Sequence, residues 1–346
     1  MYMKYFIAAF FVAFLSLAAL AQDYHFTQFY AAPLTLNPAL TGAFDGKYRV
    51  STIYRDQWRS PQTSPYQTFA ASTDFRFELD NHSKSQDVVA VGLLVANDRS
   101  KIYDSNQTQL MVSGAYIKSL NDENNQFLTL GLQGGLAQRG VNYENFNLPD
   151  EWNGSGGYTY GSLEQLPTNT TSYGDLSTGI NYTFSPSRKT TFFVGAAIHH
   201  ITQPNISFYE VDKQKSFLKR KYSVQMSAQL PINERVTISP RVLFAIQGTQ
   251  AQLNIGTNFR LKLGENTATA LHIGGWIRPT KNVDKPFEVT DGVLMCGLEL
   301  NNFLLGMSYD LNLKSIPQYN RAQGAFEISL GYLGNFDSET ILCPKF

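Results

Sequence analysis

The sequence is poor in charge, has almost no cysteine and carries no long apolar run after its first 21 residues. Charged side chains make up 16% of the 346 residues, against roughly 25% in average soluble proteins. The 28 basic and 28 acidic residues cancel, so the chain lacks the positive field that attracts nucleic acid. Two cysteines are too few for a disulfide-built fold. No later uncharged run approaches the roughly 20 residues of a membrane helix. These absences exclude a helical membrane protein and a nucleic-acid-binding protein.

Aromatic residues, in contrast, are abundant: 24 Phe and 19 Tyr bring the aromatic content to 13%. Low charge with many aromatic and β-branched residues leaves a large soluble β protein or an outer-membrane barrel.

The N-terminus indicates export. Lys4 precedes an apolar stretch that ends on Ala19-Leu20-Ala21, the small-x-small pattern of a signal-peptidase site. We therefore expect a cleavable signal peptide over 1–21, rather than an uncleaved membrane anchor, and a mature chain that begins at Gln22.

From residue 46 onward, segments of about ten residues alternate between apolar and polar side chains, and turn-forming residues separate them. A soluble sandwich shows the same alternation. About fourteen strands are expected, at 46–58, 66–77, 87–97, 107–119, 126–140, 175–184, 190–201, 221–230, 235–247, 250–261, 267–278, 292–301, 303–311 and 325–336.

Three features favour a barrel over a sandwich. Connections after odd-numbered segments are mostly long and those after even-numbered ones mostly short, as extracellular loops and periplasmic turns are. Tyr and Phe collect at segment ends, like membrane-interface girdles, and the signal peptide delivers the chain to the periplasm. The sequence therefore predicts an all-β, antiparallel transmembrane barrel over 46–336 in the outer membrane. A periplasmic segment over 22–45 precedes it, and a periplasmic tail over 337–346 follows.

No catalytic or cofactor motif is present: there is no Walker loop, HExxH or G-x-S-x-G. His199 and His200 are adjacent, so on a strand they should point to opposite faces and cannot share a metal. A barrel phospholipase would need Ser and His on neighbouring strands, and Ser is too common on polar faces to indicate one. We expect a protein that is not an enzyme and has no cofactor or metal.

Charged residues fall on the inward face of particular segments: basic ones on the first, ninth and tenth, and acidic ones on the last three. Because closure places the last strand beside the first, an acidic wall should meet a basic one. We interpret this either as a network of ion pairs that narrows the lumen or as a pore selective for charge. The predicted lumen charge network comprises Arg49, Arg55, Arg241, Arg260, Glu299, Asp310 and Glu327.

Residues 22–45 are rich in aromatic and leucine side chains, and such a segment should not remain exposed to water. It either enters the lumen as a plug or packs at the periplasmic mouth of the barrel. Pro33 and Pro38 oppose a long insertable helix, so we expect packing at the mouth.

Two loops differ sharply in charge. Residues 140–187 contain no Lys or Arg, whereas 213–221 contain five. The two loops either cap each other over the barrel or present a binding surface, since Tyr and Trp anchor protein interfaces. The candidate partner-binding residues are Trp152, Tyr158, Tyr160 and Tyr173.

The two cysteines are not expected to pair within one chain. Cys296 has the parity opposite to Glu299, so it should face lipid. Cys343 lies in the tail on the periplasmic side, and a disulfide requires Cα atoms within about 7 Å.

Several stretches coincide with the pattern of one family: Gln28-Phe29-Tyr30, Leu36-Asn37-Pro38-Ala39-Leu40-Thr41-Gly42, Tyr54-Arg55-Asp56-Gln57-Trp58, Ser308-Tyr309-Asp310-Leu311-Asn312-Leu313, 324–332 and Cys343-Pro344-Lys345-Phe346. Together they resemble the PorP/SprF family of type IX secretion system membrane proteins from the Bacteroidota. The resemblance implies a barrel in outer-membrane lipid that serves secretion, gliding motility or surface retention of adhesins. It also implies periplasmic lipoprotein or peptidoglycan-binding partners and cargo with a C-terminal sorting domain.

The alternative function is a diffusion channel for small or hydrophobic solutes, which resembles the long-chain fatty acid transporters in strand number. Single-channel conductance separates the two functions.

Overall fold

The computed structural model describes residues 23–59, 65–79, 86–101, 104–143, 147–158, 162–164, 166–187, 189–209, 216–264, 268–281, 286–313 and 324–334. The expected signal peptide, the expected C-terminal tail, Tyr160 and Cys343 lie outside these residues. Within the described part of the chain, no helix is long and apolar enough to cross a membrane.

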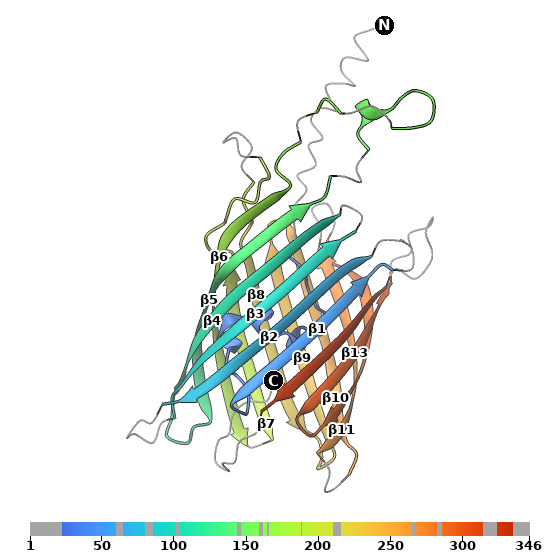
Figure 1. Ribbon diagram of the computed structural model, residues 1–346. Coiled ribbons are helices and arrows are strands. Elements are labelled where there is room, and N and C mark those ends of the chain that lie inside the picture. The colour runs from blue at the N-terminus through green and yellow to red at the C-terminus, as the bar shows by residue number, and fades with distance from the viewer. Residues whose placement is uncertain are drawn as a thin grey trace.

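The described residues form fourteen antiparallel strands that close into a barrel (Figure 1). Strands adjacent in sequence pair with each other, and β1 pairs with β14 to close the barrel, with Arg55 opposite Glu327. The predicted fold is confirmed, because each predicted segment overlaps one strand. The strands are β1 (Tyr48–Gln57), β2 (Tyr66–Glu78), β3 (Val88–Ser100), β4 (Ser105–Ser119), β5 (Gln126–Val141), β6 (Thr170–Ser187), β7 (Thr190–His199), β8 (Lys221–Pro231), β9 (Val236–Gln247), β10 (Gln250–Lys262), β11 (Thr269–Lys281), β12 (Glu288–Leu300), β13 (Phe303–Asn312) and β14 (Ala325–Leu333).

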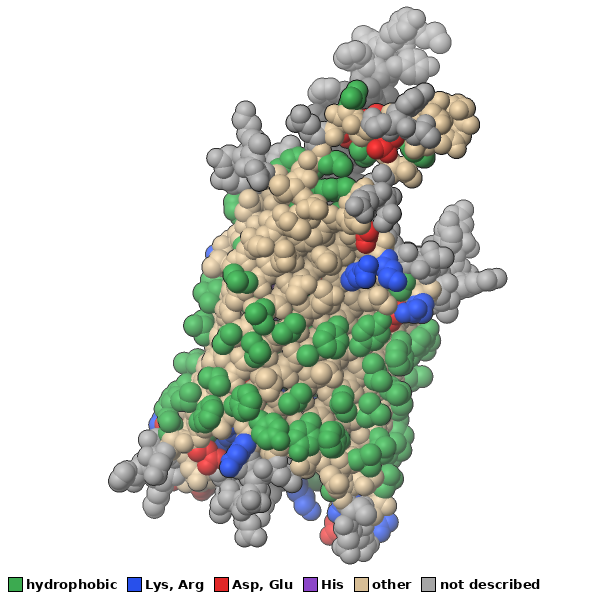
Figure 2. Space-filling model, viewed as in Figure 1, with side chains coloured by type: hydrophobic (Ala, Val, Ile, Leu, Met, Phe, Trp, Pro, Cys, Tyr) green, Lys and Arg blue, Asp and Glu red, His purple; other side chains and the backbone are tan. Residues whose placement is uncertain are grey.

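Side chains alternate between the outer wall and the lumen. On β3, Val91 and Leu93 are exposed on the outside, whereas Ala90 and Leu94 are buried inside. Figure 2 shows hydrophobic side chains spread over the outer wall and charged ones gathered towards its ends. Cys296 is exposed and free on β12, as its parity predicts. An apolar outer wall of this kind faces lipid in membrane barrels.

The two ends of the barrel differ in their connections. One end, here called the short-turn end, carries tight connections such as Asn301-Asn302. The opposite end, the long-loop end, carries the connections after β5 and β7. β5 and β6 are the two longest strands, with 16 and 18 residues, and the loop between them stands above the barrel in Figure 1.

Residues 23–45, here called the plug, lie inside the barrel rather than at its mouth. From Phe26 to Phe44 nearly every residue is buried. The plug contains three short helices, η1 (Phe29–Ala31), α2 (Pro33–Leu36) and η2 (Pro38–Leu40), which Figure 1 shows within the barrel. The expectation of packing at the periplasmic mouth is therefore wrong. No long helix has to enter, since Pro33 and Pro38 each lie at the start of a short helix, where the missing N–H is tolerated.

Candidate functional site

The middle of the plug is held by apolar packing on both sides of the lumen. Leu36, Leu40 and Ala43 join a buried cluster with wall residues of β9, β11 and β12, including Trp276. Leu34 joins a second cluster with residues of β1 to β4. Leu34 and Leu40 have no exposed surface, so the plug is part of the core of this barrel.

Glycines in the wall make room for the plug. A Cβ atom on Gly131 of β5 would lie 2.3 Å from the backbone of Pro38 and Ala39. A Cβ on Gly179 of β6 would lie 1.8 Å from the Asn37 side-chain oxygen. Backbone can approach this closely only where no side chain intervenes, so wall and plug are fitted to each other.

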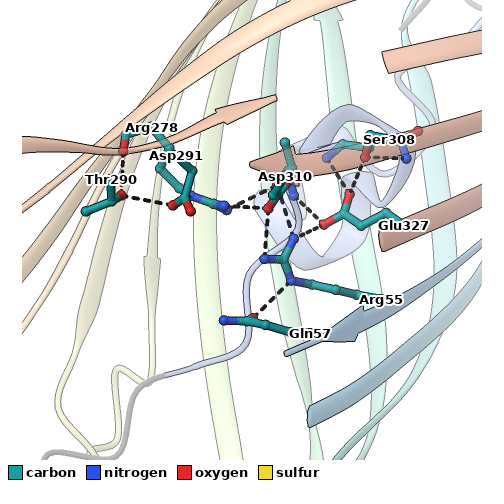
Figure 3. A network of polar contacts seen from close by, with 10 residues as sticks. Arg55, Gln57, Arg278, Thr290, Asp291, Ser308, Asp310 and Glu327 are labelled. Carbon is teal, nitrogen blue, oxygen red and sulfur yellow. Dashed lines mark hydrogen bonds and ion pairs between the residues drawn. The ribbon is translucent and has the colours of Figure 1, made fainter. Parts of the chain in front are cut away.

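A buried ion cluster fixes the start of the plug at the seam between β1 and β14. Arg55 of β1 contacts Asp310 Oδ2 at 2.9 Å and Glu327 Oε1 at 2.5 Å. Arg278 of β11 also reaches Asp310. Figure 3 shows these side chains converging from separate strands. We call these residues, together with Thr27, the closure cluster.

The plug supplies hydrogen-bond donors to this cluster. The backbone N–H groups of Thr27 and Gln28 donate to the two Glu327 oxygens at 2.7 and 2.9 Å. The Thr27 hydroxyl donates to Asp310 and accepts from Arg55 and Arg278 at 3.1 Å each. Glu327 and Asp310 are 0% and 1% exposed. Buried charges are stable only when paired and hydrogen-bonded, and both conditions hold here.

Arg49 forms a separate pair near the other end of the plug. Its Nη2 lies 2.7 Å from Asp74 Oδ2 and donates to the Leu40 carbonyl at 2.9 Å, while Gly42 N–H donates to Asp74 at 2.8 Å. Arg49 therefore pairs with β2 and the plug rather than with the acidic wall. Asp74 has the inward parity of its strand, and this signal was available in the sequence.

Arg260 of β10 and Glu299 of β12 meet across the intervening strand β11. The guanidinium binds the carboxylate through two hydrogen bonds, Nε to Oε2 at 2.7 Å and Nη2 to Oε1 at 2.8 Å. His272 Nε2 lies 3.0 Å from the same carboxylate. This trio is only partly buried and lies on β10, β11 and β12.

Arg241 does not join an ion pair within the described part of the chain. Its guanidinium carbon lies 4.1 Å from the centre of the Tyr30 ring, and Nη1 is buried without a hydrogen-bond partner. The expected pairing with the acidic wall is wrong for this residue. The aromatic ring of the plug takes the place of a carboxylate, through a cation–π contact.

The loop residues divide into two groups. Trp152 and Tyr158 form a small β-bridge, are 46% and 49% exposed, and have ring centres 5.2 Å apart. Asn153 Oδ1 stabilises the turn between them by accepting from the N–H groups of Ser155 and Gly157. Tyr173, in contrast, is 7% exposed on β6, so it does not belong to an exposed binding surface.

His199 and His200 both face the lumen, contrary to the alternation expected of a strand. β7 ends at His199, and His200 has φ of 56°, the left-handed conformation that reverses where its side chain points. His199 Nε2 contacts the Leu36 carbonyl at 3.1 Å, and His200 Nε2 contacts Asp23 at 2.7 Å. Both histidines therefore hold the plug.

A closed barrel with an apolar outer wall and a lumen filled by its own N-terminal segment defines the class of transmembrane β-barrel proteins. The family model described as "Type IX secretion system membrane protein PorP/SprF" matches residues 18–332. The chain belongs to this family. A search of curated proteins finds no match.

Solved structures of similar shape are outer-membrane barrels. The CymD monoaromatic hydrocarbon channel has a TM-score of 0.51 at 9% identity, over 89% of this chain and 94% of CymD. A Pseudomonas aeruginosa FadL homologue has 0.49 at 11%, over 86% and 92%. The Pseudomonas putida toluene transporter TodX has 0.47 at 12%, over 92% and 96%. At such low identity these similarities concern the fold alone.

Proposed function

We propose that this protein is a non-enzymatic outer-membrane component of the type IX secretion or gliding machinery, which supports export or surface attachment of cargo by binding. Its long-loop end meets cargo that carries a C-terminal sorting domain. Its short-turn end meets periplasmic lipoprotein or peptidoglycan-binding components. The observation that carries this proposal, beyond membership of the family, is the plug.

The plug favours binding over conduction for a physical reason. Residues 26–44 occupy the lumen with buried side chains, and the closure cluster ties them to β1, β11, β13 and β14. A solute that crosses the barrel would have to displace these paired charges. Breaking a buried ion pair costs about 3–5 kcal/mol. The resting barrel should therefore not conduct solutes, and should instead act as a platform on which other proteins dock.

Trp152 and Tyr158 are the candidate contact for cargo. The bridge and the Asn153 turn hold the two rings in place before any partner arrives, which reduces the entropy lost on binding. Asp150, Glu151 and Glu164 lie in the same loop. We expect the complementary cargo surface to combine apolar and basic side chains.

The test replaces both rings, as Trp152→Ala with Tyr158→Ala, in cells that secrete a surface adhesin. Cargo at the cell surface, measured with antibody, should fall severalfold while the barrel still shows heat-modifiable migration on gels. Tyr209→Ala is the matched control, since Tyr209 is also exposed, at 48%, in a loop of the same end. Normal cargo on an assembled double variant would move the contact elsewhere.

A diffusion channel remains the second candidate because a cavity of about 300 Å³ lies beside the plug, towards the long-loop end. Arg55, Gln252 and Thr280 are among its lining residues. Planar-bilayer recording separates the two functions: the platform should be electrically silent, whereas steady unitary conductance would favour the channel.

A further inference from the structure

Two cavities flank the first residue of the plug. The larger, about 300 Å³, is lined mainly by β8 to β14 and β1. The smaller, about 30 Å³, includes Gln109, Gln133 and Ser177 of β4 to β6 in its lining. Asp23 and Lys221 line both cavities. Asp23 therefore forms part of the partition that separates the two cavities in the lumen near the long-loop end.

Polar contacts from three strands and a loop hold Asp23 in this partition. Its Oδ2 lies 2.7 Å from His200 Nε2 and 3.5 Å from Lys221 Nζ. Its backbone N–H donates to Gln247 Oε1 at 3.1 Å. On the other side of the ring, His200 Nδ1 lies 2.7 Å from Asp175 Oδ2. The imidazole is thus clamped between a carboxylate of the plug and a carboxylate of β6.

This geometry requires a charged imidazole. Ionised carboxylates only accept hydrogen bonds, so each ring nitrogen of His200 must carry a proton to bond both Asp23 and Asp175. The side chain of His200 is 5% exposed, and its left-handed backbone, uncommon outside glycine, aims the ring into the lumen. A buried residue in an unfavourable conformation with two charge-assisted bonds marks a functional constraint.

We propose that Asp23, His200 and Asp175 form a latch that holds the leading end of the plug, residues 23–26, against β6 to β8. Loss of the imidazolium charge releases this end while the remainder of the plug stays docked. Release removes Asp23 from the partition, so the two cavities merge on the long-loop side of the closure cluster. The inference depends on the plug and is independent of the proposed function.

The remainder stays docked because its anchors are of another kind. Thr27 and Gln28 donate backbone N–H groups to Glu327, and Leu34 and Leu40 are fully buried. None of these contacts involves His200. The moving part is therefore short, and it includes Tyr24, whose hydroxyl donates to Gln109 at 3.2 Å.

Among the residues that the structure describes, four groups face His200 and set the pH at which it loses its proton. Asp175 from β6 and Asp23 from the plug favour the protonated, charged ring of His200. His199 from β7 lies beside His200, and Lys221 from β8 lies beside Asp23. When His200 loses its proton, Lys221 still attracts Asp23 at 3.5 Å. This single longer contact does not keep residues 23–26 in place once His200 is neutral, and removal of the Asp23 charge abolishes it as well.

Hydrogen exchange read by mass spectrometry on the full chain in detergent tests the latch. Near neutral pH, Asp23→Asn and His200→Gln should speed exchange at the amides of residues 23–26, read from overlapping peptides, about tenfold. Exchange in a peptide over 33–41 should stay unchanged. Asp98→Asn is the matched control, because Asp98 is another half-buried carboxylate near the long-loop end, bonded to Thr68 rather than to the plug.

The double variant Asp23→Asn with His200→Gln should exchange no faster than the more affected single variant, since both changes break one contact. Wild type at about pH 10 should show the same local acceleration relative to 33–41, without any substitution. Unchanged exchange over 23–26 in both variants and at high pH would overturn the latch. Equal acceleration over 23–26 and 33–41 would also overturn it, because the plug would then open as one unit.

Discussion

The two halves of the plug are held to the same barrel by different forces. The leading half, up to Gln28, is held by carboxylates and cations: Asp23 with His200, and Thr27 with Asp310. The trailing half, from Leu34 to Leu40, is held by apolar contacts and by glycines in the wall. Apolar packing is insensitive to pH, whereas an ion pair weakens at a pH that removes one of its two charges. In the proposed latch only residues 23–26 depend on the charge of His200, whereas Thr27, Gln28 and the trailing half stay anchored to the barrel.

The largest expected effect is at the closure cluster. Glu327→Ala leaves the buried Arg55 guanidinium with one carboxylate fewer and orphans the N–H groups of Thr27 and Gln28. We expect a loss of about 3–5 kcal/mol in unfolding free energy. Urea unfolding in lipid vesicles, followed by tryptophan fluorescence, measures it.

The control is Glu299→Ala, whose carboxylate pairs with Arg260 and His272 on the wall and is 24% exposed. The loss in unfolding free energy caused by Glu299→Ala should be clearly smaller than that caused by Glu327→Ala. Equal losses would mean that the contacts between Glu327 and the plug contribute nothing to the unfolding free energy.

A smaller effect is expected in the trailing half. Gly131→Ala would place a Cβ 2.3 Å from the backbone of Pro38 and Ala39, so the backbone of the plug would have to move. Overpacking of this kind costs about 1–3 kcal/mol. Gly114→Ala on β4 is the control, since its Cβ would meet nothing closer than 3.9 Å. The same unfolding measurement applies, and matched stabilities would contradict the close fit of wall and plug.

The smallest expected effect is a pH dependence in the leading half. Burial alone would lower the pKa of His200, but Asp23 and Asp175 outweigh it and raise the pKa to about 9. In the unfolded chain the pKa is about 6.5. Because the folded value is the higher one, this stabilisation is complete below about pH 6.5 and is lost as the pH rises through about 9. Burial would raise the pKa of Asp23, but His200 and Lys221 hold it well below its usual range, so mild acid leaves the pair intact.

Between neutral pH and about pH 10, wild type should therefore lose on the order of 1 kcal/mol more than His200→Gln does. Unfolding free energies of the two proteins at both pH values give the difference directly. Parallel declines would show that His200 carries no linked stability.

Particular residues show how far sequence reasoning reaches. Arg55 and Glu327 were expected to meet, because strand parity and barrel closure together place them side by side. Asp74 shares the inward parity of its strand and lies directly opposite Arg49, so parity and pairing could have found it. Arg278 also points inward, but parity does not specify that it reaches Asp310 two strands away and Thr27 of the plug. His200 escaped prediction for a local reason: alternation assumes extended backbone, and its φ of 56° breaks that assumption at the end of β7.

The fourteen strands, their two faces and the outward position of Cys296 could be predicted from the amino-acid pattern alone. A period of two is local, and a lipid-facing side chain needs no particular partner, so neither inference requires knowledge of contacts far along the chain. The position of residues 23–45 inside the lumen, in contrast, depends on contacts that the folded barrel creates. A segment without periodicity carries no sign of where it is buried. That depends on room left by distant glycines such as Gly131 and Gly179, and on carboxylates that lie about 300 residues away in sequence, as Thr27 and Glu327 do.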